Sequence, residues 1–287
     1  MVQIVESRVI ADSTPDELRD ERTFESADGA WRLHFHDPDE WHMGADAWQV
    51  KLTYHDKDVS AGHQLFKTIR TGKGFHLPAR YQPWCQDKPV VALHPWNSTI
   101  YLYGVDDNRS IQRQLSSFPL EIQWAPRGEL LGITCEGQVQ LLNKNAECFA
   151  SISIQHPRNE NPEAFWWPDG RQLFVVSRES RTVKTRLSFF DSSGGELLSS
   201  TEFDPLDLLP YDEASYAKID RDRYTLDVGS GIRLVGYLLD KWSRLEFDSE
   251  RCLLRGTVYR PEGPCEEKRG EYTCTARERS IEVALRA

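Results

Sequence analysis

The residues best suited to chemistry stand close together, between His34 and His42 in the stretch HFHDPDEWH. On a β-strand His34 and His36 point to one face, and His42, Asp37 or Asp39 can return from the following turn to complete a set of metal ligands. The same residue types are ordinary turn formers, so a polar hairpin tip explains the stretch as well. The spacing therefore permits a metal site at His34, His36 and His42 without requiring one.

Catalytic signatures are missing from the rest of the sequence. There is no Gly-x-Ser-x-Gly elbow, no phosphate-binding loop and no His-Glu-x-x-His motif. Gly72-Lys73-Gly74-Phe75 lacks the third glycine of a dinucleotide-binding loop. We therefore expect no cofactor and a non-enzymatic function, with a hydrolase, metal-dependent or not, as the alternative.

The elements that position such residues are clearest between Ala164 and Glu196. Phe165 to Trp167 form a short apolar strand. Pro168-Asp169-Gly170 then has the residues of a turn, because proline fixes one backbone angle and glycine tolerates a positive φ. The β-branched and aromatic run from Leu173 to Val176 follows, and then an alternating strand from Val183 to Phe190. This region predicts two antiparallel strand pairs.

The same order of turn and strand recurs along the chain. We place equivalent turns at Ala27, Pro95, Pro126 and Pro168, with a weaker copy near Arg221. The last two strong copies are 42 residues apart and match almost position for position. Such units stack on neighbours because a single one cannot bury both of its faces.

The motif Trp166 to Gly170, with its apolar strand, resembles the repeats of propellers like the translocation protein TolB and, more distantly, WD-repeat proteins. The resemblance covers residues 117–204 well, and residues 24–116 and 214–260 loosely. It implies an all-β, propeller-like fold of about five blades in a single domain, residues 1–287. The irregular repeat spacing leaves an antiparallel β-sandwich as the alternative.

The two ends of the chain are predicted to close this domain. Val2 to Ile10 alternates weakly as a strand, and Thr14-Pro15-Asp16-Glu17 has the residues of a helix start, for a short helix to about Arg22. Residues 1–23 therefore close or cap the domain. Ile281 to Leu285 is a spare last strand, which we expect to pair with the first or to join the same sheet.

The composition bears on the cellular location of the protein. The chain has 287 residues, and no apolar run approaches the ~18 residues that a membrane helix needs. The N-terminus lacks a basic segment followed by an apolar one, so we expect no secretory signal and a cytoplasmic location. Its six cysteines include no Cys-x-x-Cys, and Cys135, Cys148 and Cys252 are predicted to be buried free thiols. In a secreted chain, Cys265 and Cys274 would be the pair to test.

The net charge restricts the chemical class of the partner. A net charge of −10 argues against nucleic acid, which needs a cationic footprint. Residues 1–60 contain 14 acidic and 6 basic residues. This excess is either a solvated face or a patch that steers a basic partner.

The function that fits these observations is a protein-binding module, in which a rigid scaffold presents loops and exposed aromatic rings to another protein. An immunity protein or a subunit of a larger assembly would fit. The predicted core includes Trp124, Ile133, Trp167, Phe174 and Val176. The predicted binding residues are Trp41, Trp84, Trp96, Tyr211, Asp212 and Glu213.

Overall fold

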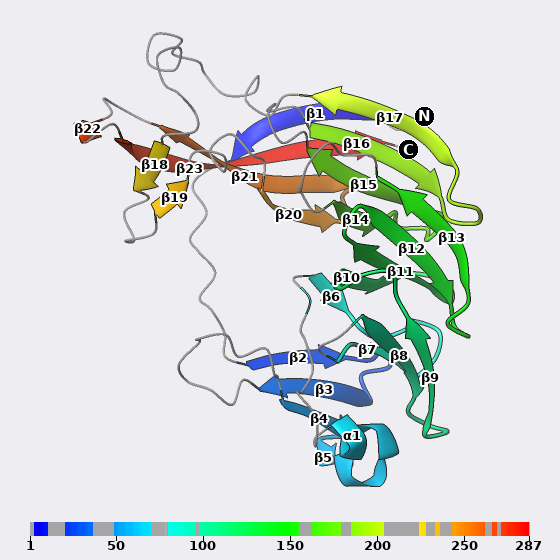
Figure 1. Cartoon of the computed structure of the whole chain (residues 1–287). Helices are drawn as coiled ribbons and strands as arrows, with labels where there is room; N and C mark the ends of the chain where they lie inside the picture. The colour runs from blue at the N-terminus through cyan, green and yellow to red at the C-terminus, as the bar shows by residue number, and fades with distance from the viewer. Residues whose placement is uncertain are drawn as a thin grey trace.

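The described residues of the computed structural model form five β-sheets that follow one another in an arc (Figure 1). The all-β prediction is confirmed. The structure describes residues 3–10, 21–36, 49–69, 78, 80–95, 98–154, 162–178, 185–203, 224–227, 233–235, 243–261, 266–268 and 271–286.

The first two sheets form the lower end of the arc in Figure 1. The first contains β2 (Glu21–Glu25), β3 (Trp31–His36), β4 (Gln49–Tyr54) and β5 (Lys57–Asp58), in that order. The second contains β7 (Val90–Leu93), β8 (Thr99–Gly104) and β9 (Arg109–Gln114). Two short helices lie between these sheets in the sequence, η1 (Ser60–Gly62) and α1 (Gln64–Ile69).

The third and fourth sheets form the middle of the arc. The third has the order β13-β12-β11-β10-β6, from β6 (Arg80–Gln82), β10 (Pro119–Trp124), β11 (Leu130–Cys135), β12 (Gln138–Asn143) and β13 (Cys148–Ser153). The fourth is β14 (Glu163–Trp166), β15 (Gln172–Arg178), β16 (Thr185–Asp191) and β17 (Leu197–Phe203). These four strands confirm the two strand pairs predicted after Ala164.

The last sheet joins the two ends of the chain. Strand β1 (Gln3–Ile10) pairs antiparallel with β23 (Glu271–Arg286), from Gln3 opposite Arg286 to Ile10 opposite Ser280, which confirms the predicted pairing. β23 also pairs with β21 (Leu253–Pro261), which pairs with β20 (Ser243–Asp248). The other members are β18 (Tyr224–Asp227), β19 (Arg233–Val235) and β22 (Glu266–Lys268).

One hairpin recurs in all five sheets. In four of them, a residue near the end of one strand lies opposite the residue seven positions later, on the next strand, and in the second sheet Trp84 makes the equivalent pairing as an isolated bridge to β7. Glycines with positive φ occupy three of the turns, because the backbone there is left-handed. The five pairs are Glu25 with Arg32, Trp84 with Val91, Trp124 with Leu131, Trp166 with Leu173, and Phe247 with Leu254.

Buried tryptophans tie each of three sheets to the one before it. A buried indole N–H needs an acceptor, and here the acceptor is a backbone carbonyl of the preceding sheet or of the segment leading into it. The bonds are Trp84 Nε1 to Phe24 O (2.9 Å), Trp124 Nε1 to Pro83 O (2.7 Å) and Trp166 Nε1 to Gln123 O (3.0 Å).

The predicted core residues are all buried. Trp124 and Ile133 belong to a cluster that spans the first three sheets, while Phe174 and Val176 belong to one between the fourth sheet and the last. Trp167 lies in the second cluster, with its ring centroid 5.8 Å from that of Phe247. Apolar contacts between neighbouring sheets therefore bury the hairpins.

Two sequence predictions need correction, and one element was not predicted. Pro126 and Pro168 lie just before β11 and β15, the strands that pair with Trp124 and Trp166. The strand that pairs with Trp84 is β7, and Pro95 follows it, so the predicted repeat at Pro95 is one strand out of register. The predicted helix cannot reach Arg22, because β2 begins at Glu21 and pairs with β3. Helix α1 was not predicted; it is only six residues long, and Leu65 and Phe66 hold it by burial in the core.

The described cysteines have free thiols. Cys135 is buried, as predicted, but Cys148 is only half-buried. Cys252 is also half-buried and stands in a turn with φ 52° rather than in a strand. Cys265 and the side chain of Cys274 lie outside the described residues. No helix in the described part of the chain is long and apolar enough to span a bilayer.

Candidate functional site

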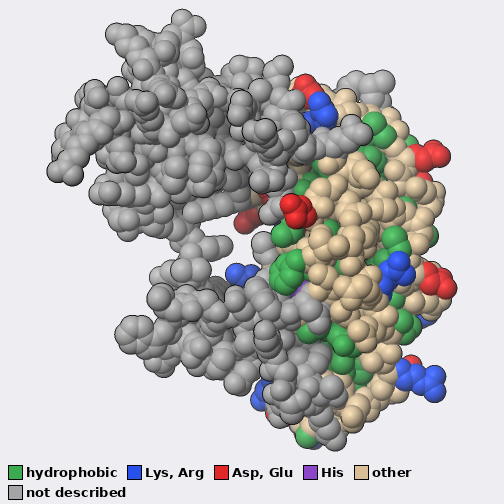
Figure 2. Space-filling model, viewed as in Figure 1, with side chains coloured by type: hydrophobic (Ala, Val, Ile, Leu, Met, Phe, Trp, Pro, Cys, Tyr) green, Lys and Arg blue, Asp and Glu red, His purple; other side chains and the backbone are tan. Residues whose placement is uncertain are grey.

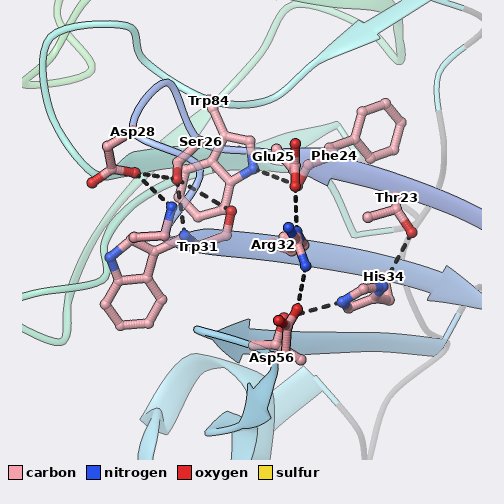
Figure 3. A network of polar contacts seen from close by, with 12 residues as sticks. Thr23, Phe24, Glu25, Ser26, Asp28, Trp31, Arg32, His34, Asp56 and Trp84 are labelled. Atoms are coloured by element: carbon pink, nitrogen blue, oxygen red, sulfur yellow. Dashed lines mark hydrogen bonds and ion pairs between the residues drawn. The ribbon is translucent and has the colours of Figure 1, made fainter.

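The imidazole of His34 sits between two threonine hydroxyls, and Figure 3 labels the first of them, on Thr23. Its Nδ1 is 3.1 Å from Thr23 Oγ1 on β2, and its Nε2 is 3.0 Å from Thr53 Oγ1 on β4. His36 is the last residue of β3. Within the described residues no three His, Cys, Asp or Glu side chains are placed to hold a metal ion. The other expected ligands, His42, Asp37 and Asp39, lie outside those residues, so the metal site stays a prediction.

Polar contacts around His34 organise the β2–β3 hairpin (Figure 3). The Ser26 hydroxyl donates to Asp28 at 2.6 Å and accepts from the Trp31 backbone N–H at 2.9 Å. The hydrogen bond from Ser26 lowers the pKa of the Asp28 carboxyl. Arg32 pairs with Glu25 and with Asp56. Each of these side chains is used within the hairpin or its neighbouring strand, which indicates a structural role.

Trp84 is not an exposed binding residue, contrary to prediction. Its side chain is 3% exposed, and its indole donates to the Phe24 carbonyl across the boundary between two sheets (Figure 3). The physical reason is its repeat position, which matches that of Trp124 and Trp166. The other predicted binding residues lie outside the described residues: Trp41, Trp96, Tyr211, Asp212 and Glu213.

A groove of about 620 Å³ opens between the end of β13 and one face of β15, β16 and β17. We call it the β13–β17 groove. Most of its exposed apolar surface comes from Leu197, which is 59% exposed, while Val175 and Phe190 also line it but are buried. The full lining is Ser153, Ile154, Val175, Ser177, Arg186, Ser188, Phe190, Leu197, Ser200 and Glu202.

The turn between β16 and β17, which precedes Leu197 of the groove, packs closely against β13. Gly195 has φ +73°, and a Cβ there would lie 3.2 Å from side-chain atoms of Ala150 and Ile152 on β13. The missing side chain therefore lets the turn approach β13 closely. Sequence reasoning found the strands but could not find the groove, because alternation does not show which face a neighbouring sheet leaves uncovered.

Four polar side chains of the groove pair with one another. Arg186 Nε donates to Glu202 Oε1 at 2.8 Å, and the Ser188 and Ser200 hydroxyls are 3.1 Å apart. Arg186 and Glu202 are each more than two-fifths exposed, so this ion pair contributes little to stability. The groove therefore offers apolar surface framed by polar groups with little net charge.

A second cluster joins β6, β10, β14 and β20, which belong to three sheets, and these strands lie on the concave side of the arc (Figure 1). Arg80 on β6 contacts Glu121 Oε1 on β10 at 2.9 Å and also pairs with Glu163 on β14. Its guanidinium donates to the carbonyl of Leu245 on β20 at 2.9 Å. Its Cζ stands 3.9 Å from the centroid of the Phe165 ring. One side chain thus joins three sheets.

Glu121 is the most enclosed member of the Arg80 cluster, with 6% of its side chain exposed. Its Oε2 accepts hydrogen bonds from Thr134 Oγ1 at 3.0 Å and from the Ala164 backbone N–H at 2.9 Å. Burial raises the pKa of Glu121 to about 7, although Arg80 and the Ala164 amide act to lower it. Nothing in the local sequence pattern singles out these residues.

No protein-family model matches the chain, and no curated protein matches it. Among solved structures, Kuenenia stuttgartiensis hydrazine synthase, an assembly with β-propeller subunits, matches with a TM-score of 0.53 at 10% identity, over 91% of this chain and 62% of that chain. BamB from Moraxella catarrhalis matches with a TM-score of 0.34 at 13% identity, over 70% of this chain and 52% of that chain. This chain thus spans less than two thirds of the length of either.

The five successive sheets and the first of these matches agree on the architecture. The chain has a β-propeller-like fold. At 10% identity the likeness shows the fold alone.

Proposed function

We propose that the chain is a non-enzymatic protein-binding module, a propeller-like scaffold that docks another protein at the β13–β17 groove. One observation carries the proposal: a groove of about 620 Å³ with apolar surface lies beside two strongly exposed leucines, Leu197 and Leu198. Exposed apolar surface framed by polar groups is typical of protein interaction sites. A space of this size accepts a few side chains of a partner.

The partner that fits best is a basic protein that inserts apolar side chains into the groove. The net charge of the chain is −10, and opposite charge speeds the encounter of two proteins. On the face in Figure 2 acidic, basic and hydrophobic side chains are interspersed. Residues 1–60, with 14 acidic and 6 basic residues, carry most of the acidic excess. An immunity protein that blocks a basic toxin and a subunit of a larger assembly both fit this proposal.

The test uses the full chain and one substitution in the groove. Leu197→Asp places a charge at the groove rim, on a side chain that is 59% exposed, so folding should be preserved. The matched control is Ile111→Asp, on edge strand β9, where the side chain is 42% exposed. A partner is first isolated by affinity purification from the native host, and its affinity for each purified variant is then measured by calorimetry.

We expect Leu197→Asp to weaken binding about tenfold or more, as loss of an interface anchor does, and Ile111→Asp to bind like the parent. Equal affinity of parent and Leu197→Asp for every isolated partner would rule out the groove. The identity of the partner, a toxin or an assembly component, then separates the two roles.

A further inference from the structure

Two carboxylates share one guanidinium in the Arg80 cluster. Ionised Glu121 must share the positive charge of Arg80 with Glu163, and the negative charge of Glu163 opposes the ionisation of Glu121. The site is largely shielded from water, since Arg80 is 21% exposed, Glu121 6% and Glu163 18%. A buried carboxylate with a shared cation is costly, and uptake of one proton by Glu121 removes the cost.

We propose that Arg80, Glu121 and Glu163 form a proton-sensitive junction between the sheets. When Glu121 is protonated, Arg80 pairs with Glu163 in full, and β6, β10, β14 and β20 stay closed on one another. When the proton leaves, the negative charge buried at Glu121 loosens their contact. The molecule therefore carries, at the meeting point of three sheets, a device that responds to pH.

Glu121 is the residue that holds the proton. It is more buried than Glu163, and its pKa is raised to about 7. The charged groups that face it from the described elements are Arg80 on β6 and Glu163 on β14. Thr134 on β11 contributes a hydroxyl, which can turn to accept the carboxyl proton.

The sign of the pH effect follows from the direction of the pKa shift. The folded value, about 7, lies above the ordinary value of 4.5, so the folded protein binds the proton more tightly than the unfolded chain does. The stability that Glu121 contributes is therefore fully present below pH 4.5, the ordinary pKa, and is lost as the pH rises from there through about 7.

The experiment measures the melting temperature of the full chain between about pH 5 and pH 8.5 for the parent and two variants, a range that spans the titration of Glu121. Glu121→Gln keeps the shape of the side chain but cannot titrate. Glu202→Gln removes one acidic charge from the exposed pair with Arg186 and serves as the control. We expect the parent to lose melting temperature relative to Glu121→Gln as the pH rises from about 5, with the loss levelling off near pH 7, and Glu202→Gln to run parallel to the parent.

A third variant tests the sharing of Arg80 and remains informative if Glu121→Gln does not fold. Glu163→Gln leaves the guanidinium to Glu121 and removes a neighbouring negative charge, so the pH at which the loss levels off should move down by about one unit. Hydrogen exchange of β10 and β14, corrected for intrinsic rates, should also be faster in the parent than in Glu121→Gln at the alkaline end of the range. A constant difference between the parent and Glu121→Gln between about pH 5 and 7, or a loss that levels off at the same pH in Glu163→Gln as in the parent, overturns the proposal.

Discussion

Gly170 shows how one residue fixes the distance between two sheets. Its φ is +71°, and a Cβ at this position would lie 2.7 Å from the backbone oxygen of Arg127, in the equivalent turn of the preceding sheet. Gly29 has nearly the same φ, +69°, but a Cβ at that position would meet no atom within 4 Å. Substitutions at these two glycines therefore distinguish the cost of backbone strain from the cost of a close contact.

We predict that Gly29→Ala costs about 1 kcal/mol, from strain in the left-handed region alone. Gly170→Ala should cost about 2–4 kcal/mol, because overpacking against Arg127 adds to that strain. Urea denaturation of both variants measures the difference. Equal losses would mean that the contact between the two turns contributes nothing.

Trp84 shows what residue type alone does not reveal. A tryptophan in a polar stretch was expected at the surface, yet its repeat position places it in the core. Trp84, Trp124 and Trp166 are 40 and 42 residues apart, which is a more regular spacing than that of the turns aligned on proline. Alignment on these tryptophans, instead of on Pro95, would have found both the correct register and the burial.

At the scale of elements, β1 protects a long strand. It pairs with the C-terminal half of β23, from Ser280 to Arg286, and so covers one edge of that strand. We predict that deletion of residues 1–10 exposes this edge and lowers solubility well beyond the effect of losing a frayed end. Light scattering and thermal melting measure the change.

A synthetic peptide of residues 1–10, added in trans, provides the control for that deletion. It should restore part of the lost melting temperature, because binding to the folded state stabilises it. A deletion variant that melts and dissolves like the parent would show that β1 is dispensable for the sheet.

The hairpins could be read from the sequence because their signals are local. Pro168-Asp169-Gly170 and the apolar strands on either side determine one hairpin within about ten residues. Contacts between sheets could not be read in this way. Arg80, Glu121 and Glu163 are about 40 residues apart in sequence and meet only because three sheets pack together. The β13–β17 groove is invisible in the sequence for the same reason.

At the scale of the whole molecule, the net charge of −10 makes a prediction about association with a basic partner. The association rate should fall as salt rises from low to physiological ionic strength, because screening limits charge interactions to about 8–10 Å. The dissociation rate, set by contacts in the groove, should change less. Stopped-flow mixing at several salt concentrations measures both, and a salt-independent association rate would remove the electrostatic part of the proposal.

The tryptophan bonds between sheets all run in one direction. Each indole donates to a carbonyl that precedes it in the chain: Trp84 to Phe24, Trp124 to Pro83 and Trp166 to Gln123. During synthesis on the ribosome, each of these sheets therefore meets an acceptor that has already been made. Strand β1 waits for its partner, because β23 ends at Arg286 and is translated after the other strands that the structure describes. The first of these strands to leave the ribosome is thus among the last to find its place.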